Sequence, residues 1–338
     1  MNPKIMVNVG QRSADYELLK KMTLAGMDIA RLNFSHASNE QLIELKANLA
    51  KVKEETGKEV TILQDLCGPR IRVGVLPADI HLREGEVYSF SFNKCEGEEK
   101  CIPIDNDELV NDMKVGHVFY LANGAMELSV QKIENGKIYA VVERGGHLSS
   151  RKGINVPMTN LSSGGLTKKD EIDAEFGREQ KVDYVGLSFV QNAEDVIKLR
   201  KIVGPDIKII AKIERATALP EIDKILNEAD GIMIARGDLG IEMPLEELPI
   251  LQKQLINHAH WHKKPAIVAT QMMLSMVEKS HPTYAEVTDV ANAVFDGADV
   301  LMLSDETSVG KYPLECVVTM KKIINRTDEY SNKTNHWS

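Results

Sequence analysis

Eight short runs rich in valine and isoleucine recur along the chain, and this repeat constrains its fold more than any other feature. Most runs are followed by a helix-length amphipathic stretch, and most lack the in-out alternation of half-exposed strands. This alternation predicts βα units in a parallel sheet that is buried on both faces. The runs cover residues 4–9, 28–32, 60–64, 182–187, 207–212, 231–235, 266–269 and 299–303.

The spacing of the runs sets one segment apart. Successive runs begin 24 to 35 residues apart, except for a gap of 122 residues after the third run. Short alternating pieces within that gap, separated by Gly- and Asn-containing turns, are typical of a small all-β domain; they cover residues 86–92, 118–121, 127–132 and 137–143. The sequence therefore predicts an α/β fold, a (β/α)8 TIM barrel of residues 1–72 and 158–338, with a β-rich lid of residues 73–157 inserted after strand 3.

The length agrees with this interpretation, because 338 residues accommodate a barrel of about 250 residues plus the insert. The alternative is an open doubly wound sheet, which calls for a glycine fingerprint after the first strand. Residues 9–12 read Val-Gly-Gln-Arg and do not supply one.

Composition excludes several classes of function. Lys and Arg total 41 against 50 Asp and Glu, a net charge of −9, so no basic footprint indicates nucleic-acid binding. The N-terminus shows no signal peptide, and no long apolar run predicts a membrane span. The four cysteines have no CxxC spacing, so we expect a reduced, cytoplasmic protein in which Cys95 and Cys101 are free thiols.

Polar residues follow the strand runs, at the edge where barrel enzymes carry their chemistry. Lys212 and Glu214 are two residues apart, so they project from one face of an extended segment, and Asp238 follows the next strand. Two carboxylates without a neighbouring His or Cys suit Mg²⁺ or Mn²⁺ better than zinc. The basic residues Arg31 and Arg72 favour a ligand with carboxylate or phosphate groups. Alternatively, any of these charges ties a loop to the barrel rim.

Longer motifs are identified at the same positions. They read Ala-Arg-Leu-Asn-Phe-Ser-His at 30–36, Asp-Leu-Cys-Gly-Pro-Arg-Ile-Arg at 65–72, Ile-Ile-Ala-Lys-Ile-Glu at 209–214, Ala-Arg-Gly-Asp-Leu-Gly at 235–240 and Ala-Thr-Gln-Met-Met-Leu at 269–274. Together with Lys-Gly-Ile-Asn-Val-Pro at 152–157 and Leu-Met-Leu-Ser-Asp-Glu-Thr at 301–307, they run through nearly the whole chain in order. The sequence resembles the pyruvate kinase family, whose fold is a barrel with a lid after strand 3.

The resemblance implies an Mg²⁺- or Mn²⁺-dependent phosphoryl transfer between phosphoenolpyruvate and ADP, giving pyruvate and ATP through enolpyruvate. It implies that the catalytic residues are Lys212, Arg31, Thr270 and Ser304, and that substrate is bound by Arg31, Lys212, Gly237, Asp238 and Thr270. It assigns the divalent metal to Glu214 and Asp238, and nucleotide contacts to Arg72, His36 and Lys152. It places a potassium site at Asn33, Ser35, Asp65 and the Leu66 carbonyl.

The chain departs from the family pattern mainly on the nucleotide side. Arg70 stands where the family has a glutamate beside the potassium site, and we hypothesise that its guanidinium replaces K⁺. Residues 122–124 read Ala-Asn-Gly in place of Asp-Asp-Gly. Two alternatives therefore stay open: a divergent paralogue that uses the same metal and enolate site for another acceptor or for lyase or aldolase chemistry, and a non-catalytic metabolite-binding regulator.

A predicted helix of residues 313–327 completes the eighth βα unit, and about eleven residues follow it. Family members typically continue with a regulatory α/β domain. The resemblance thus implies a barrel and lid without that domain, with any homodimer or larger homo-oligomer formed through the barrel.

Overall fold

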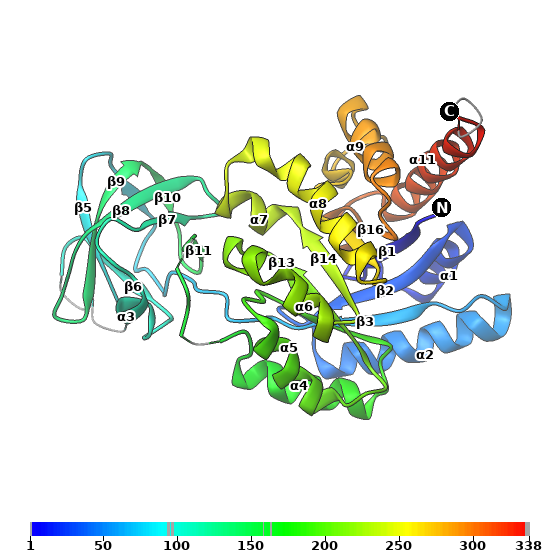
Figure 1. Ribbon diagram of the computed structural model, residues 1–338, viewed down its shortest axis with the longest axis horizontal. Helices are drawn as coiled ribbons and strands as arrows, with labels where there is room; N and C mark the ends of the chain where they lie inside the picture. The colour runs from blue at the N-terminus through cyan, green and yellow to red at the C-terminus, as the bar shows by residue number, and fades with distance from the viewer. Residues whose placement is uncertain (1, 93–94, 96–97, 158, 163, 335–338) are drawn as a thin grey trace.

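The computed structural model describes residues 2–92, 95, 98–157, 159–162 and 164–334. Eight parallel strands close into a barrel in the order β1-β16-β15-β14-β13-β12-β3-β2, which confirms the predicted fold (Figure 1). Each predicted run overlaps one barrel strand. The strands are β1 (Lys4–Asn8), β2 (Met27–Asn33), β3 (Thr61–Asp65), β12 (Tyr184–Leu187), β13 (Lys208–Ile213), β14 (Gly231–Ala235), β15 (Ala266–Ala269) and β16 (Val300–Leu303).

Helices surround the barrel and connect its strands (Figure 1). The main ones are α1 (Tyr16–Ala25), α2 (Asn39–Thr56), α4 (Lys168–Glu179), α5 (Ala193–Val203), α6 (Ile222–Glu228), α8 (Leu248–Trp261), α9 (Tyr284–Phe295) and α11 (Pro313–Thr334). Capping boxes begin α2, α4, α5 and α9, where an N-cap side chain and the third helical residue satisfy each other's backbone N–H groups. Two short helices directly follow barrel strands: α7 (Arg236–Glu242) follows β14, and α10 (Asp305–Ser308) follows β16.

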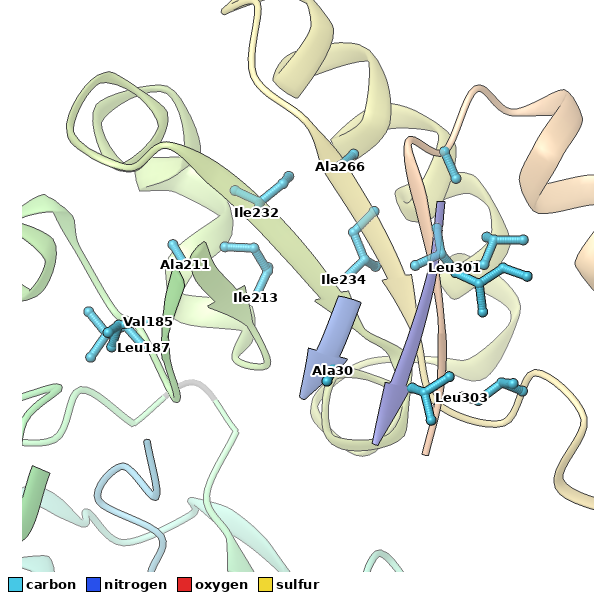
Figure 2. Packing of buried hydrophobic residues seen from close by; sticks show 14 of the residues in the cluster. Ala30, Val185, Leu187, Ala211, Ile213, Ile232, Ile234, Ala266, Leu301 and Leu303 are labelled. Atoms are coloured by element: carbon cyan, nitrogen blue, oxygen red, sulfur yellow. The ribbon is translucent and has the colours of Figure 1, made fainter. Parts of the chain in front are cut away.

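The period of two along each strand divides the buried side chains into two layers. In β14, Ile232 and Ile234 point outward and pack beneath the helices, as Leu301 and Leu303 do in β16 (Figure 2). Met233, between the two isoleucines, belongs to a separate cluster that fills the barrel interior. Burial on both faces accounts for the continuous apolar runs of the sequence.

The lid forms its own hydrophobic cluster and extends from one end of the barrel (Figure 1). A six-stranded sheet has the order β11-β7-β8-β9-β5-β6, and β10 pairs with β4 beside it. The lid strands are β4 (Ile80–Leu82), β5 (Val87–Phe92), β6 (Cys101–Ile104), β7 (Val118–Leu121), β8 (Met126–Glu134), β9 (Lys137–Arg144), β10 (Gly146–Leu148) and β11 (Ile154–Asn155), with one helical turn, α3 (Leu109–Asp112). The lid inserted after strand 3 is thereby confirmed. The predicted boundary at 157/158 falls beside Met158, which lies outside the described residues.

One prediction about the lid is wrong. Cys95 and Cys101 form a disulfide rather than two free thiols. Strands β5 and β6 are parallel neighbours, so the chain after β5 must return toward the start of β6. That return brings the two Cα atoms to 5.3 Å, a separation that a spacing of six residues in a charged loop does not reveal.

None of the helices in the described part of the chain combines the length and the apolar character that a membrane span requires.

Candidate functional site

The inward-facing positions of the barrel strands change from apolar to polar at the carboxyl ends. Ile210 fills the barrel interior, and two and four residues later the same face of the chain carries Lys212 and Glu214. Leu63 precedes Asp65 in β3 in the same way. The strand period therefore assembles a charged layer directly above an apolar plug.

A cavity of about 590 Å³ opens above this layer. It brings together most of the residues that the sequence predicted for catalysis, substrate and metal. These are Arg31, Asn33, Ser35, Lys212, Glu214, Gly237, Asp238, Thr270 and Ser304, and Arg70 also lines the cavity.

A buried ion cluster lies at the floor of the site. Asp65 is fully buried and accepts from Arg31 Nε at 2.6 Å, while its other oxygen lies 3.2 Å from Lys212 Nζ. Burial alone would raise the pKa of Asp65, but Lys212 and Arg31 hold it below its ordinary value. The carboxylate is thus kept ionised, and it fixes two cations beside the cavity.

Lys212 is held by three acceptors at once. Its Nζ lies 2.7 Å from Ser188 Oγ and 3.0 Å from Glu214 Oε1, in addition to Asp65. Burial would lower the pKa of Lys212, but the two carboxylates reverse this effect and raise it. The charged form of Lys212 is therefore favoured, and three acceptors hold its ammonium at the cavity.

Glu214 and Asp238 supply carboxylate oxygens to the same cavity. Burial is the main cause that raises the pKa of Glu214; Lys212 opposes it, and the charges of Asp238 and Asp65 add to it. A divalent cation between the two carboxylates would relieve this repulsion, and an all-oxygen donor set fits Mg²⁺ or Mn²⁺. In the part of the chain that the structure describes, no three His, Cys, Asp or Glu side chains are grouped to hold a metal, so substrate or water oxygens would complete the shell.

The loop after β15 is anchored to helix α7. Arg236 forms two 2.8 Å hydrogen bonds to the Asp289 carboxylate and donates to the Thr270 carbonyl at 2.9 Å. The Thr270 hydroxyl accepts from the Gly237 N–H at 2.8 Å. Thr270 has a φ of 70°, an uncommon conformation for a β-branched residue, and Gln271 and Phe189 at the same cavity also have positive φ. Such strain is concentrated at functional sites and requires the surrounding anchors.

Arg70 lies across the mouth of this cavity. Its guanidinium is 3.4 Å from Asp238 Oδ1 and 3.2 Å from Asn123 Oδ1 of the lid. Its contacts therefore join the lid to the barrel.

The residues predicted for K⁺ are engaged with one another or with neighbours. Asn33 Oδ1 accepts from the Ser35 N–H, and the Leu66 carbonyl accepts from Ser188 Oγ at 2.8 Å. Asp65 is bound by the two cations described above.

The residues predicted for nucleotide contact lie outside the lining of the 590 Å³ cavity. Arg72 and Lys152 lie on the two segments that join barrel and lid, where Arg72 pairs with Gly153. His36 follows β2, and its N–H donates to the Asn33 carbonyl.

The sequence prediction assigned no role to two polar residues of this layer. Ser188 links Asp65, Leu66 and Lys212. Asn8 lines the cavity, and its buried side-chain oxygen has no hydrogen-bond partner in the described structure. Each comes two residues after an inward-facing position of its own strand. The period of two would therefore have indicated that both side chains face the site.

Fold and site together define a (β/α)8-barrel enzyme with a β lid beside a charged cavity suited to a small anionic substrate and a divalent metal. Residues 1–317 match the model of the pyruvate kinase barrel domain. The chain is 45% identical over 331 residues to the pyruvate kinase of Thermococcus litoralis, covering 97% of this chain and 70% of that protein. It is 38% identical to the pyruvate kinase of Thermotoga maritima, covering 96% of this chain and 71% of that protein, and 41% identical to that of Geobacillus stearothermophilus, covering 96% and 57%.

The chain belongs to the pyruvate kinase family. It is an enzyme with the glycolytic activity of that family, and a divalent metal is implied. This confirms the predicted family and the kinase interpretation.

Proposed function

We propose that the chain catalyses Mg²⁺-dependent phosphoryl transfer between phosphoenolpyruvate and ADP in the 590 Å³ cavity. Glu214 and Asp238 would hold the metal, with Mn²⁺ as a substitute. When bound, the ion supplies positive charge to the carboxylate and phosphoryl oxygens of the substrates. The chain's own part is electrostatic positioning, because phosphoryl transfer asks for little covalent chemistry from the protein.

Arg31 and Lys212 hold the charge that the reaction needs. Arg31 would grip the phosphoryl group, and Lys212 would stabilise the negative charge that moves between phosphoryl oxygens and the enolate of pyruvate. The observation that carries this assignment is the ammonium of Lys212, which is buried, kept charged and fixed by three acceptors. Preorganised charge in a water-poor site is among the strongest contributions to catalysis.

Thr270, Gly237 and Ser304 would orient the organic half of the substrate. Gly237 has no side chain to cover its backbone N–H. This N–H donates to Thr270 Oγ1 in the structure, and it would donate to the carboxylate of a bound substrate. Ser304 lines the cavity, and its buried Oγ has no hydrogen-bond partner among the described residues, so a proton relay could use it. We assign Thr270 and Ser304 to the relay that protonates the enolate carbon.

Arg72, His36 and Lys152 would contact the nucleotide. Two of them lie on the connections between barrel and lid, so the nucleotide would bind where the two parts meet. Asn33, Ser35, Asp65 and the Leu66 carbonyl would form the monovalent-cation site. The guanidinium of Arg70, which lines the same cavity as Asn33 and Ser35, would supply positive charge in place of K⁺.

The test is exchange of the pyruvate methyl protons for deuterium, which reports enolate formation without phosphoryl transfer. We expect Mg²⁺-dependent exchange in the wild type and a loss of at least about 100-fold in Lys212→Met. Lys208→Met is a matched control, because Lys208 lies on the same strand, is exposed and stacks on Tyr184 at the far end. Undiminished exchange in Lys212→Met would refute the role of this lysine.

A further inference from the structure

Arg70 connects three parts of the molecule. It comes from the segment between β3 and the lid, and it contacts Asp238 of α7 and Asn123 of the turn between β7 and β8. A Cβ built on Gly153 would lie 3.3 Å from the guanidinium, so the side chain also lies against the segment that returns from the lid. One planar group thus spans both connections and the cavity.

The lid turn meets α7 at a second point. A Cβ on Gly124 would lie 3.6 Å from Ile241, which is three residues after Asp238 on the same helix. The contact through Arg70 and this close approach of Gly124 to Ile241 join the same lid turn to the same helix. Displacement of the turn would therefore change the surroundings of the helix that carries Asp238.

The charge arrangement gives this contact a chemical consequence. Arg70 and Asp238 are 29% and 20% exposed, so their attraction is only partly screened by water. A divalent cation at Asp238 would compete with the guanidinium for the same carboxylate. Asn123 is neutral and would keep its hold on Arg70.

We propose that Arg70 is a positioning residue that couples the lid to Asp238, so that metal binding at Asp238 and the contact between lid and barrel oppose each other. The inference rests on the proposed role of Asp238 as a metal ligand. Coupling of this kind is reciprocal: if the metal weakens the lid contact, loss of the lid contact strengthens metal binding by the same factor.

The first test is Mn²⁺ affinity, measured by electron paramagnetic resonance of the free ion in potassium buffer. Arg70→Gln should bind Mn²⁺ about threefold to tenfold more tightly, because the competing cation is gone. Arg144→Gln is the matched control: Arg144 donates to the carbonyl of Gly124 at 2.8 Å, beside the same turn, without a described contact to the barrel. Equal Mn²⁺ affinity in wild type and Arg70→Gln, or the same tightening in Arg144→Gln, would overturn the coupling.

The second test is amide hydrogen exchange of β7 and β11. Saturating Mn²⁺ should speed this exchange severalfold in the wild type and leave Arg70→Gln unchanged. Asn123→Gly keeps the positive φ of 58° at this position without strain. Its amide exchange should match that of Arg70→Gln, and the double variant should exchange no faster than either single variant. Two results would contradict the proposal: additive effects of the two substitutions in the double variant, or a speeding of exchange by Mn²⁺ in Arg70→Gln that is as large as in the wild type.

Asp238→Asn distinguishes the two proposals. Mn²⁺ affinity should fall at least about tenfold in this variant if Asp238 is a ligand. Unchanged affinity would refute the metal site itself. If Mn²⁺ affinity is weakened in Asp238→Asn but equals the wild-type value in Arg70→Gln, only the coupling is refuted.

Discussion

Asp65→Asn removes the central charge of the site while keeping the shape of the side chain. The wild-type carboxylate is fully buried and bridges Arg31 and Lys212, each of which is 7% exposed. Lys212 keeps Glu214 at 3.0 Å in the variant, but Arg31 has no other ion pair among the described residues. The substitution therefore leaves one buried guanidinium without a counter-charge.

The expected loss of stability follows from the ion pairs that the substitution removes and those that it leaves. Removing one partner of a buried ion pair costs about 3–5 kcal/mol. We expect the lower end, about 3 kcal/mol, because Lys212 remains paired. Activity should fall as well, roughly 100-fold in kcat/KM, since both cations lose the group that fixes their position.

The assay is urea unfolding followed by circular dichroism, with Glu278→Gln as control. Glu278 pairs with Lys311 at the surface, both side chains being more than half exposed, so its loss should change the free energy of unfolding by less than about 1 kcal/mol. The reasoning is refuted if Asp65→Asn lies within that range of the wild type.

The pH dependence provides an independent check on the same residue. Because the folded-state pKa of Asp65 is lowered, its charge stabilises the fold above the unfolded pKa of about 3.9, and this contribution disappears as pH falls through the folded value. The stability difference between wild type and Asp65→Asn should shrink as the pH falls below about 4. A difference that grows as the pH falls would contradict the sign of the shift.

Two further predictions concern the cation requirement and the thiols. If the guanidinium of Arg70 replaces K⁺, turnover in potassium and in tetramethylammonium salts should be equal; strict K⁺ dependence would exclude the replacement. Of the four cysteines, only Cys67, which lines the cavity, should react with a thiol reagent in the native state, because burial raises the pKa of Cys316 to about 12. A second thiol should appear on unfolding and the remaining two only after reduction; four thiols without reductant would disprove the disulfide.

Local sequence was sufficient for the architecture. Apolar runs of strand length, repeated at the spacing of βα units, determine which segments form the barrel, because burial on both faces leaves few other structures for them. The same period of two determines that Lys212 and Glu214 share a face and that polar residues after each strand meet at one rim. These properties depend on residues that are neighbours in the sequence, so they can be predicted without knowing which strands pair.

Contacts between distant segments were decided by the tertiary structure alone. Arg70 and Asn123 each stood out separately as departures from the family pattern, but only the folded structure brings them within 3.2 Å across 53 residues of sequence. Asp65 lies between Arg31 and Lys212 because the barrel places β2, β3, β12 and β13 in succession, with Gly186 of β12 leaving space for the Asp65 carboxylate. Strand register and chain closure set these distances, whereas a one-dimensional pattern records only which face each side chain occupies.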